Sequence, residues 1–516
     1  MLSSLYIGAT GMKSLSEGMN VTSNNLANCS TVGFKSQMAL YSDLIPQNQA
    51  NPGEWNNNQE GSLVAVGQVG MGVRVDEVKT NFTQGGFEST NNATDLAING
   101  KGFFVVQDNF GETYYSRAGN FTLDDEGTMR NPNGFTLEGV DLGMQEANDI
   151  SHAYASKETN ASEQTSWSLD ALEPVNINKF QDLAAKQTSS LSIIDANFNT
   201  SASTATDLTD PYFSMLKNYD ANQDTPLAET RYSYAQALSL YDSEGKAHEV
   251  TIYYDGRGHN AAQSALEFLV ADNSATEAGS GSGLLMSGVL TFDEKGELAG
   301  LAAYTPEEAG NTDLATWTQA ALSADGTPTF SLDGAQIALD FGIRSQSGSW
   351  EGEGTAADVG TMVDNLTLLG DAERATSAAT SYTNESFMAS SSQDGYGEGA
   401  LSSYSIGTDG VVYGNFSNGE NMKMWQIPLA RFTSEAGLRR TGDNLFVPTA
   451  EAGSMALGNP GSENYGTTIS QSIEQSNVDL SREMVTMIVT QRGFQSNSKV
   501  VTTSDELLKT AINLKR

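Results

Sequence analysis

Three side chains with calcium-binding chemistry, Asp220, Asn222 and Asp224, begin like the loop of an EF-hand. Thr225 then occupies the position that needs a glycine, and Arg231 occupies that of the bidentate glutamate. Both departures remove the geometry on which such a site depends. We therefore expect no calcium site in this segment.

A glycine-rich stretch offers a second chemistry, because Gly352-Glu-Gly354-Thr-Ala-Ala357 fits a relaxed dinucleotide-binding pattern. No apolar strand precedes it and Glu353 would face the pyrophosphate, so we expect a loop. With one cysteine, Cys29, and three scattered histidines, no intrachain disulfide and no zinc site of cysteine and histidine is expected. The histidines are His152, His248 and His259. We predict no catalytic, cofactor-binding or metal site, and no enzyme.

The composition indicates an acidic, turn-rich chain of about three or four domains. Its 516 residues include 51 glycines and carry a net charge of −37, which disfavours binding to nucleic acid and to anionic membranes. Apolar stretches are only a few residues long, so no membrane insertion is expected. The N-terminus shows no basic and then apolar pattern of a cleavable signal peptide.

This charge is distributed unevenly. In residues 1–40, Lys13 and Lys35 oppose Glu17 for a net charge of +1, and residues 478–516 carry +2. The region between them therefore carries −40. Near-neutral ends on an acidic body favour ends that pack against copies of themselves.

A heptad pattern predicts a long C-terminal helix over residues 477–515, about 58 Å in length. Ser476 and Asp479 predict a capping box at its start. One row of the heptad is apolar and the interleaved row is mixed. The apolar row is Leu480, Met487, Phe494, Val501 and Leu508, and the mixed row is Met484, Gln491, Ser498, Asp505 and Ile512.

A weaker heptad predicts a second helix at the N-terminus. Its apolar positions are Leu5, Met12, Met19 and Leu26, with Leu15 on an adjoining row. Three glycines in this segment each cost about 0.5–1 kcal/mol relative to alanine, so the helix is not expected to be stable alone. An asparagine-rich cluster and Gly33 are expected to end it.

The heptads leave two interpretations open. The two helices could form an intramolecular coiled coil that clips the ends of the chain together. Alternatively they could contact several neighbours in a polymer, because rows diluted by Gln491, Ser498 and Asp505 bury too little area with one partner. In the second case we expect helices that fold on assembly.

Between the ends, alternation with a period of two predicts short strands in antiparallel hairpins. The predicted strands are Phe103–Val106, Tyr114–Leu123, Ala237–Tyr241, Val250–Tyr254 and Gly288–Phe292. One turn pattern recurs at 124–127, 242–245 and 293–296, with Asp first and Gly last as a type I turn prefers. The predicted fold class is mixed, with terminal α-helices forming a coiled-coil-like domain and mainly antiparallel, nested and discontinuous β domains.

Polar stretches rich in small residues predict the domain boundaries. We expect a helical assembly domain from 1–35 and 475–516, joined through a connecting segment, 36–75. An inner β domain is expected from 76–145 and 376–474. Residues 146–375 would form an outer β domain of one or two lobes.

Motifs at both ends resemble those of bacterial flagellar rod and hook proteins. At the N-terminus these are Ser23-Asn-Asn-Leu-Ala-Asn28 and Thr31-Val-Gly-Phe-Lys35. At the C-terminus they are Ser476-Asn-Val-Asp-Leu480 and Met487-Ile-Val-Thr-Gln-Arg492-Gly-Phe-Gln-Ser-Asn497. Asp95-Leu-Ala-Ile-Asn-Gly100 and Tyr115-Ser-Arg-Ala-Gly-Asn-Phe121 are similar to the inner β-domain of that family, and Gln426-Ile-Pro-Leu-Ala430 and Gly442-Asp-Asn-Leu-Phe446 resemble its return half in the hook branch.

The resemblance covers roughly residues 1–145 and 385–516. It implies a structural subunit of the flagellar hook, a hollow curved helical tube that links rod to filament and transmits motor torque as a universal joint. A distal rod subunit is the alternative, and the long outer insertion favours the hook. An exported enzyme or adhesin with its module in 145–375 is the rival from another class.

The resemblance also implies partners and a location. The partners would be further copies of this chain, rod, hook cap and hook–filament junction proteins, and the flagellar type III export apparatus. The location would be extracellular, reached without a cleaved signal peptide. The expected assembly interface is Leu5, Met12, Leu15, Met19, Leu26, Asn28, Gly33, Phe34, Leu480, Met484, Met487, Gln491, Phe494, Val501, Leu508 and Ile512.

Overall fold

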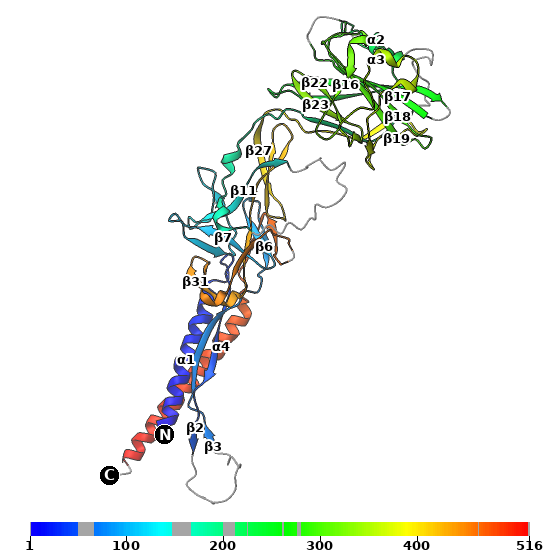
Figure 1. The fold of residues 1–516 in the computed structure, drawn as a ribbon. Helices are drawn as coiled ribbons and strands as arrows, with labels where there is room; N and C mark the ends of the chain where they lie inside the picture. Colours follow the sequence, from blue (N-terminus) through cyan, green and yellow to red (C-terminus); the bar gives the residue numbers. More distant parts are fainter. Residues whose placement is uncertain are drawn as a thin grey trace, which may run out of the picture.

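The computed structural model describes residues 2–49, 67–146, 167–199, 212–223, 225–260, 263–275, 280–462 and 464–513. It shows an elongated molecule with two long helices at one end, β-sheets in the middle and a β-rich lobe at the far end (Figure 1). The chain runs outward and returns, so both termini lie at the helical end. This confirms the predicted mixed fold class.

The two long helices, α1 (Leu2–Ala27) and α4 (Leu480–Asn513), pack side by side in opposite directions (Figure 1). Asp479 caps α4, because its Oδ1 accepts hydrogen bonds from the amides of Ser481 at 2.9 Å and Arg482 at 3.1 Å. The prediction of Ser476 as the cap is wrong, since the helix begins one turn later. Within the described ranges, neither helix is long and apolar enough to cross a bilayer.

A β-ribbon from the predicted connecting segment runs along α1. In it β1 (Gln37–Asp43) pairs with β4 (Val73–Thr80), and β2 (Gln47–Gln49) pairs with β3 (Gly67–Val69). Ser14 of α1 donates a hydrogen bond of 3.1 Å to the carbonyl of Val73. The helix α1 is therefore covered by α4 and by this ribbon.

An inner sheet of fourteen strands forms the middle of the described structure. Its main path is β13 (Asp182–Leu183), β27 (Gly399–Ile406), β28 (Val411–Phe416), β29 (Asn421–Gln426), β11 (Thr136–Glu146), β7 (Phe103–Gln107), β8 (Thr113–Ser116), β32 (Leu445–Pro448) and β31 (Leu438–Gly442). Attached to it are β9 (Thr122–Leu123), β10 (Met129–Arg130), β12 (Glu173–Pro174), β30 (Leu429–Phe432) and β33 (Met455–Gly458). Two short pairs connect it to the helices, β34 (Thr467–Ser470) with β6 (Leu96–Asn99) and β35 (Ser472–Glu474) with β5 (Phe87–Ser89).

The outer lobe contains two larger sheets. One is β15 (Tyr234–Tyr241), β16 (Ala247–Asn260), β17 (Gln263–Asp272), β18 (Leu284–Phe292), β19 (Leu298–Pro306) and β20 (Trp317–Gln319). The other is β21 (Ala321–Leu322), β22 (Pro328–Leu332), β23 (Ala335–Asp340), β14 (Ser190–Asn197) and β26 (Phe387–Gln393), in which β14 and β23 are parallel. The pair β24 (Ile343–Ser345) and β25 (Ala372–Arg374) and the short helices α2 (Ser214–Asn218) and α3 (Ala356–Val359) complete it.

The six-stranded outer sheet is buried on both faces. Leu266 and Leu290 pack in one core with Ile193 and Ile337 of the five-stranded sheet. On the opposite face, Leu269 belongs to a second core that includes residues of α2 and α3. Strands covered on both sides carry continuous apolar runs, which explains why β17 and β18 are buried almost throughout.

The three recurrent turns close hairpins as predicted. The amides of Gly127, Gly245 and Gly296 donate to the carbonyls of their turns' aspartates at 2.9, 3.1 and 3.0 Å. Each glycine has a positive φ, which favours glycine at the last position. The predicted strand 114–123 is interrupted, since β8 ends at Ser116 and β9 begins at Thr122.

Two antiparallel chain segments cross between the inner sheet and the outer lobe. Lys186 and Tyr396 exchange backbone hydrogen bonds of 2.8 Å in both directions. The carboxylate Oδ1 of Asp394 accepts the amides of Ser189 and Ser190, both at 2.8 Å. Below the crossing β13 pairs with β27 in the inner sheet, and above it β14 pairs with β26 in the outer sheet. The chain therefore passes from one sheet to the other at about residues 183–190 and returns at about residues 393–399. The division into domains at 146 and 376 stays a prediction.

Candidate functional site: the terminal helix pair and its polar junction

The buried face of α1 is built from small and polar residues. These are Gly8, Gly11, Ser14, Gly18, Thr22 and Asn25, spaced three or four residues apart. A Cβ on Gly8 would lie 2.8 Å from Cγ2 of Val501, and one on Gly11 would lie 3.0 Å from Nδ2 of Asn497. Two of the glycines that weaken α1 as an isolated helix therefore let α4 approach closely, and the third, Gly18, makes room for Tyr41 of β1.

On α4 the seam uses the predicted apolar row only in part. Met487, Val501 and Leu508 are half-buried, whereas Leu480 and Phe494 remain 49% and 37% exposed. The other row facing α1 includes Thr490, Asn497 and Ser504, which are polar. The mixed row predicted from the heptad lies outside this seam, with Ser498 half-buried and Met484, Gln491, Asp505 and Ile512 exposed.

The outward surface of α4 is strongly apolar. Val485, Val489 and Ile512 are 61%, 64% and 69% exposed. The full set of large exposed apolar side chains on α4 is Leu480, Met484, Val485, Ile488, Val489, Phe494, Val500, Leu507 and Ile512. A helix with apolar side chains on several faces needs several partners to bury them. Sequence reasoning missed Val485, Ile488 and Val489, although the apolar run 484–489 was a visible signal.

The predicted positions of α1 lie beside the seam. Leu5, Met12, Leu15, Met19 and Leu26 are all half-buried. Leu15 lies opposite Gly493, where an added Cβ would be 3.2 Å from its Cδ1. The two helices thus pair within one chain, yet each keeps apolar surface that this pairing does not cover.

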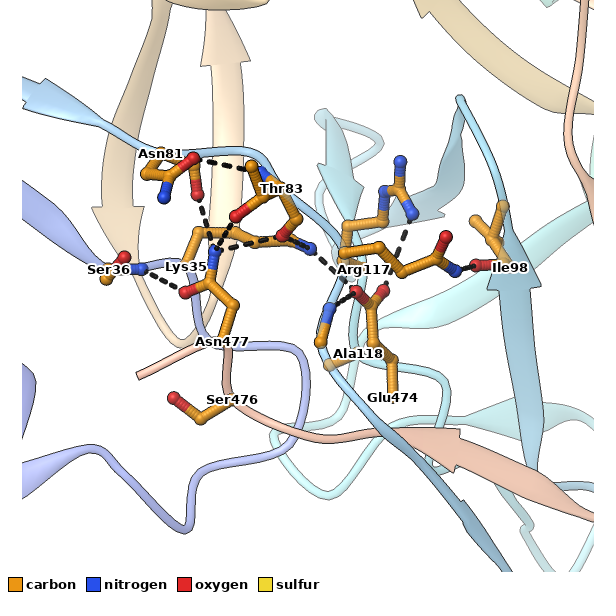
Figure 2. A network of polar contacts seen from close by, with 12 residues as sticks. Lys35, Ser36, Asn81, Thr83, Ile98, Arg117, Ala118, Glu474, Ser476 and Asn477 are labelled. Carbon is orange, nitrogen blue, oxygen red and sulfur yellow. Dashed lines mark hydrogen bonds and ion pairs between the residues drawn. The ribbon is translucent and has the colours of Figure 1, made fainter. Parts of the chain in front are cut away.

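At the top of the helix pair, three buried charges meet (Figure 2). Nζ of Lys35 lies 2.7 Å from Oε1 of Glu474, and Nη1 of Arg117 lies 3.4 Å from Oε2 of the same carboxylate. The side chains of Lys35 and Glu474 are fully buried, and that of Arg117 is 3% exposed. One carboxylate therefore joins the turn after α1, the inner sheet and the strand before α4.

The remaining polar atoms of this cluster are mostly hydrogen-bonded. Lys35 also donates to the carbonyl of Thr83 at 3.0 Å, and the amide of Gly85 donates to Oε1 of Glu474 at 2.9 Å. Arg117 donates to the carbonyl of Gly100 at 2.8 Å. Burial lowers the pKa of Lys35 and of Arg117, and the charge of Glu474 opposes both shifts. The pairing with Glu474 is thus what makes two buried cations tolerable.

Two asparagines, one near each end of the chain, complete the junction. Asn25 pairs with the backbone of Gln37 through both amide atoms, at 2.7 and 2.8 Å, and donates to Oε1 of Glu483 at 3.1 Å. Asn477 accepts the amide of Ser36 at 2.7 Å and donates to the carbonyls of Asn81 and Thr83 (Figure 2). Each side chain acts as both donor and acceptor, so each bonds to backbone groups much as a neighbouring strand would.

Gly33 and Phe34 belong to this junction rather than to an exposed surface. Gly33 has φ +67, and a Cβ there would lie 2.6 Å from the amide nitrogen of Ala118. Phe34 is 3% exposed beneath the guanidinium of Arg440, 4.4 Å from its ring centre. Asn28, half-buried, closes the turn by accepting a hydrogen bond from Thr31 at 3.1 Å.

From the sequence, Lys35 entered only a charge count and a motif, Arg117 entered only a motif, and Glu474 was not singled out. The signal available was a single charge inside an otherwise small or apolar motif, since such charges need a buried partner. The arrangement has no feature of a catalytic centre, because its titratable groups are paired structurally. It can fix the direction in which both helices leave the β-structure.

Comparison with known protein families matches four segments of the chain. They are "Flagella basal body rod protein" over residues 5–35 and "Flagellar hook protein FlgE/F/G D1 domain" over 97–182. "Flagellar basal body protein FlaE D2 domain" matches 207–396, and "Flagellar basal body rod FlgEFG protein C-terminal" matches 469–514. The matches over 5–35 and 469–514 include the two terminal helices. The chain is therefore of the class of structural proteins of the flagellar rod and hook.

Whole-chain relatives narrow the class. The chain is 30% identical to "Flagellar hook protein FlgE" of Treponema pallidum over 537 residues, which cover 100% of both proteins. It is 28% identical to the protein of that name in Escherichia coli over 507 residues, with 98% of each chain covered. The chain belongs to the flagellar hook protein family. It is a structural protein and not an enzyme, and the distal rod alternative is not favoured.

A solved structure with a related name is also similar. The crystal structure of Helicobacter pylori flagellar hook protein FlgE2 aligns with a TM-score of 0.43 and 14% identity. The alignment covers 74% of this chain and 98% of that chain. This similarity is too low to add to the family assignment.

The buried carboxylate gives the first testable prediction. Glu474→Gln keeps the shape of the side chain but removes the carboxylate that pairs with Lys35 and Arg117, so the free energy of unfolding should fall by about 3–5 kcal/mol. Guanidinium unfolding of the soluble chain measures the change. Asp76→Asn is the matched control, since its pair with Arg74 at 3.1 Å lies on the exposed β-ribbon and should contribute little to stability. Equal small effects of both variants would contradict the role given to Glu474.

Proposed function

We propose that this chain polymerises through its terminal helix pair into the curved tube of the flagellar hook. The observation that carries the proposal is the outward apolar surface of α4, from Leu480 to Ile512, which α1 and the other described elements leave open. Contacts between identical subunits that do not close into a ring generate a helical filament. In such a filament, neighbouring helix pairs would cover these side chains.

The distribution of charge supports this orientation. The terminal segments are near neutral, and the acidic charge lies in the region between them. Like charges repel less strongly when they lie far from the axis of a tube and face water. We therefore place the helix pairs on the inside, the inner sheets in the wall and the acidic outer lobes on the outer surface.

The finer roles follow from the same proposal. The tube would link rod to filament and pass motor torque as a universal joint. Its partners would be rod, hook cap and hook–filament junction proteins, and export would use the flagellar type III apparatus without a cleaved signal. The junction of Lys35, Arg117 and Glu474 would carry load from the helices into the wall, because both helices leave the β-structure at that point.

Complementation tests the proposed function. Cells that lack this gene should carry rods without hooks, and the wild-type gene should restore hooks in electron micrographs. Ile488→Asp should fail to restore them, because it places a charge on the outward surface of α4, where Ile488 is 49% exposed. Ile488→Leu is the matched control and should restore hooks. Normal hooks with Ile488→Asp would refute the role of this surface.

A second prediction concerns the seam. Gly8→Leu should prevent polymerisation, because even a Cβ at Gly8 would lie 2.8 Å from Cγ2 of Val501. Val501→Ala alone should weaken polymerisation less, and the double variant should recover part of the loss because it removes the clash. Sedimentable polymer formed by the purified variants measures the effect. Additive losses in the double variant would show that the two residues do not meet.

The third prediction concerns folding on assembly. The amides of residues 480–512 should exchange with solvent quickly in the soluble chain and slowly in the polymer, because several partners are needed to bury α4. Hydrogen exchange followed by mass spectrometry compares the two states. The inner strand β7 serves as the internal reference, because it should be protected in both. Strong protection of α4 in the soluble chain would contradict the proposal.

A further inference from the structure

A histidine in the outer lobe is surrounded by three aspartates. His248 of β16 is buried, and its side chain is only 4% exposed. Its Nε2 lies 3.2 Å from Oδ2 of Asp242 and 3.3 Å from Oδ2 of Asp333. On the opposite side of the ring, Nδ1 lies 3.0 Å from Oδ2 of Asp272. No part of the proposed hook function uses this cluster.

We propose that Nε2 of His248 and the Oδ2 atoms of Asp242 and Asp333 bind one divalent cation of the Zn²⁺ class. These three atoms all lie within 4.8 Å of one another. Nitrogen and carboxylate ligands bind Zn²⁺ at about 2.0–2.2 Å, which places neighbouring ligands of a tetrahedral site roughly 3.3 Å apart. The two distances from Nε2 match that spacing.

The fourth residue of the cluster orients the imidazole. With Nδ1–H donating to Asp272, the lone pair of Nε2 points toward Asp242 and Asp333. A carboxylate behind a metal-binding histidine fixes the tautomer and makes the ring a better ligand. Asp272 is itself held, because its Oδ1 accepts hydrogen bonds from the amide and the hydroxyl of Ser274.

The charge of the cluster also favours a divalent ion. Three carboxylates surround one imidazole, so the group is net negative whether the ring is neutral or charged. Lys246 and Glu307 line the hollow beside it and add opposite charges. The hollow has a volume of about 630 Å³, and two of the proposed ligands, His248 and Asp333, line it. It gives an ion a path from solvent and leaves room for water as a fourth ligand.

The proposed ion would connect the two outer sheets. Asp242 lies in the turn before β16 of the six-stranded sheet, and Asp333 lies in the turn between β22 and β23 of the five-stranded sheet. The turn of Asp242 also contacts the crossing to the inner sheet, since a Cβ on Gly245 would lie 2.3 Å from Cβ of Ala185. A bound ion would therefore hold the six-stranded and five-stranded sheets to each other, close to the crossing that leads to the inner sheet.

This site was not predicted from the sequence, because only cysteine and histidine were considered as zinc ligands. The prediction of no metal site rested on three histidines that are scattered along the chain. Carboxylates supply the missing ligands here, and Asp333 comes from a turn far along the sequence from His248.

Binding to the full chain tests the proposal. Protein stripped with a chelator is titrated with Zn²⁺ in a calorimeter, and one tight site per chain is expected, with a higher Tm when it is filled. Asp333→Asn should weaken this site at least tenfold. Asparagine tolerates the positive φ of +47 at that position, so the turn should be kept.

Asp293→Asn is the matched control. The Oδ1 of Asp293 accepts the amides of Lys295 and Glu297 in the same way that Asp242 accepts those of Glu244 and Lys246. Asp293 has no histidine partner among the contacts described, so its variant should bind Zn²⁺ like the wild type. Circular dichroism confirms that both variants are folded.

Three results would overturn the proposal. If the wild type and Asp333→Asn bound Zn²⁺ equally, the heat measured in the titration would come from scattered surface carboxylates and not from this site. If the wild type showed no tight site, we would conclude that His248 and its aspartates form only a structural ion pair. Tighter binding of Ca²⁺ than of Zn²⁺ would refute an imidazole ligand, because Ca²⁺ prefers oxygen.

Discussion

The carboxylate of Glu474 is the point on which the arrangement of this molecule depends. It neutralises Lys35 and partly neutralises Arg117 in a region from which water is excluded. It is the carboxylate in direct contact with both cations, and an uncompensated buried charge is strongly destabilising. Through these contacts the turn after α1, the inner sheet and the strand before α4 take one fixed arrangement. The antiparallel course of the two helices follows from that arrangement.

The helix pair that extends from this junction reverses the usual design of a coiled coil. Its internal seam is largely small and polar, with Gly8 and Gly11 facing Val501 and Asn497. Many of its large apolar side chains point outward instead, above all Val485, Ile488 and Val489 of α4. Within a single chain the two helices can thus pair closely, but the pairing leaves much of their apolar surface exposed. This division suits a protein of the hook family, whose members are structural.

Much of the local structure could be predicted from the sequence. The seven-residue spacing located both helices, and the turns beginning at Asp124, Asp242 and Asp293 located three hairpins, because both signals depend on neighbours in the chain. The assignment of the two heptad rows was only partly informative. Periodicity reports which positions share a face, but it does not report that Gly8 would meet Val501 of the apolar row while Gly11 meets Asn497 of a polar row.

The junction and the histidine cluster could not be predicted, because both depend on distant pairs. Lys35 and Glu474 are separated by 439 residues, and Arg117 and Glu474 by 357. Nothing local distinguishes Glu474 from the other 63 acidic residues. The sheet pairing of β14 with both β23 and β26 is equally remote, and it moves the change of sheet to about residues 393–399.

The crossing between the inner sheet and the outer lobe has a mechanical consequence. In the part of the chain that the structure describes, two segments connect these parts, and Lys186, Tyr396 and Asp394 hold the segments to each other. A two-stranded strap bends readily out of its own plane, yet it resists stretching because its peptide backbone is continuous. We therefore expect any tilt of the outer lobe relative to the helices to take place at this strap. In a bent array of such subunits, differences in spacing between the inside and the outside of the curve can be absorbed at this strap, while every lobe keeps its own core intact.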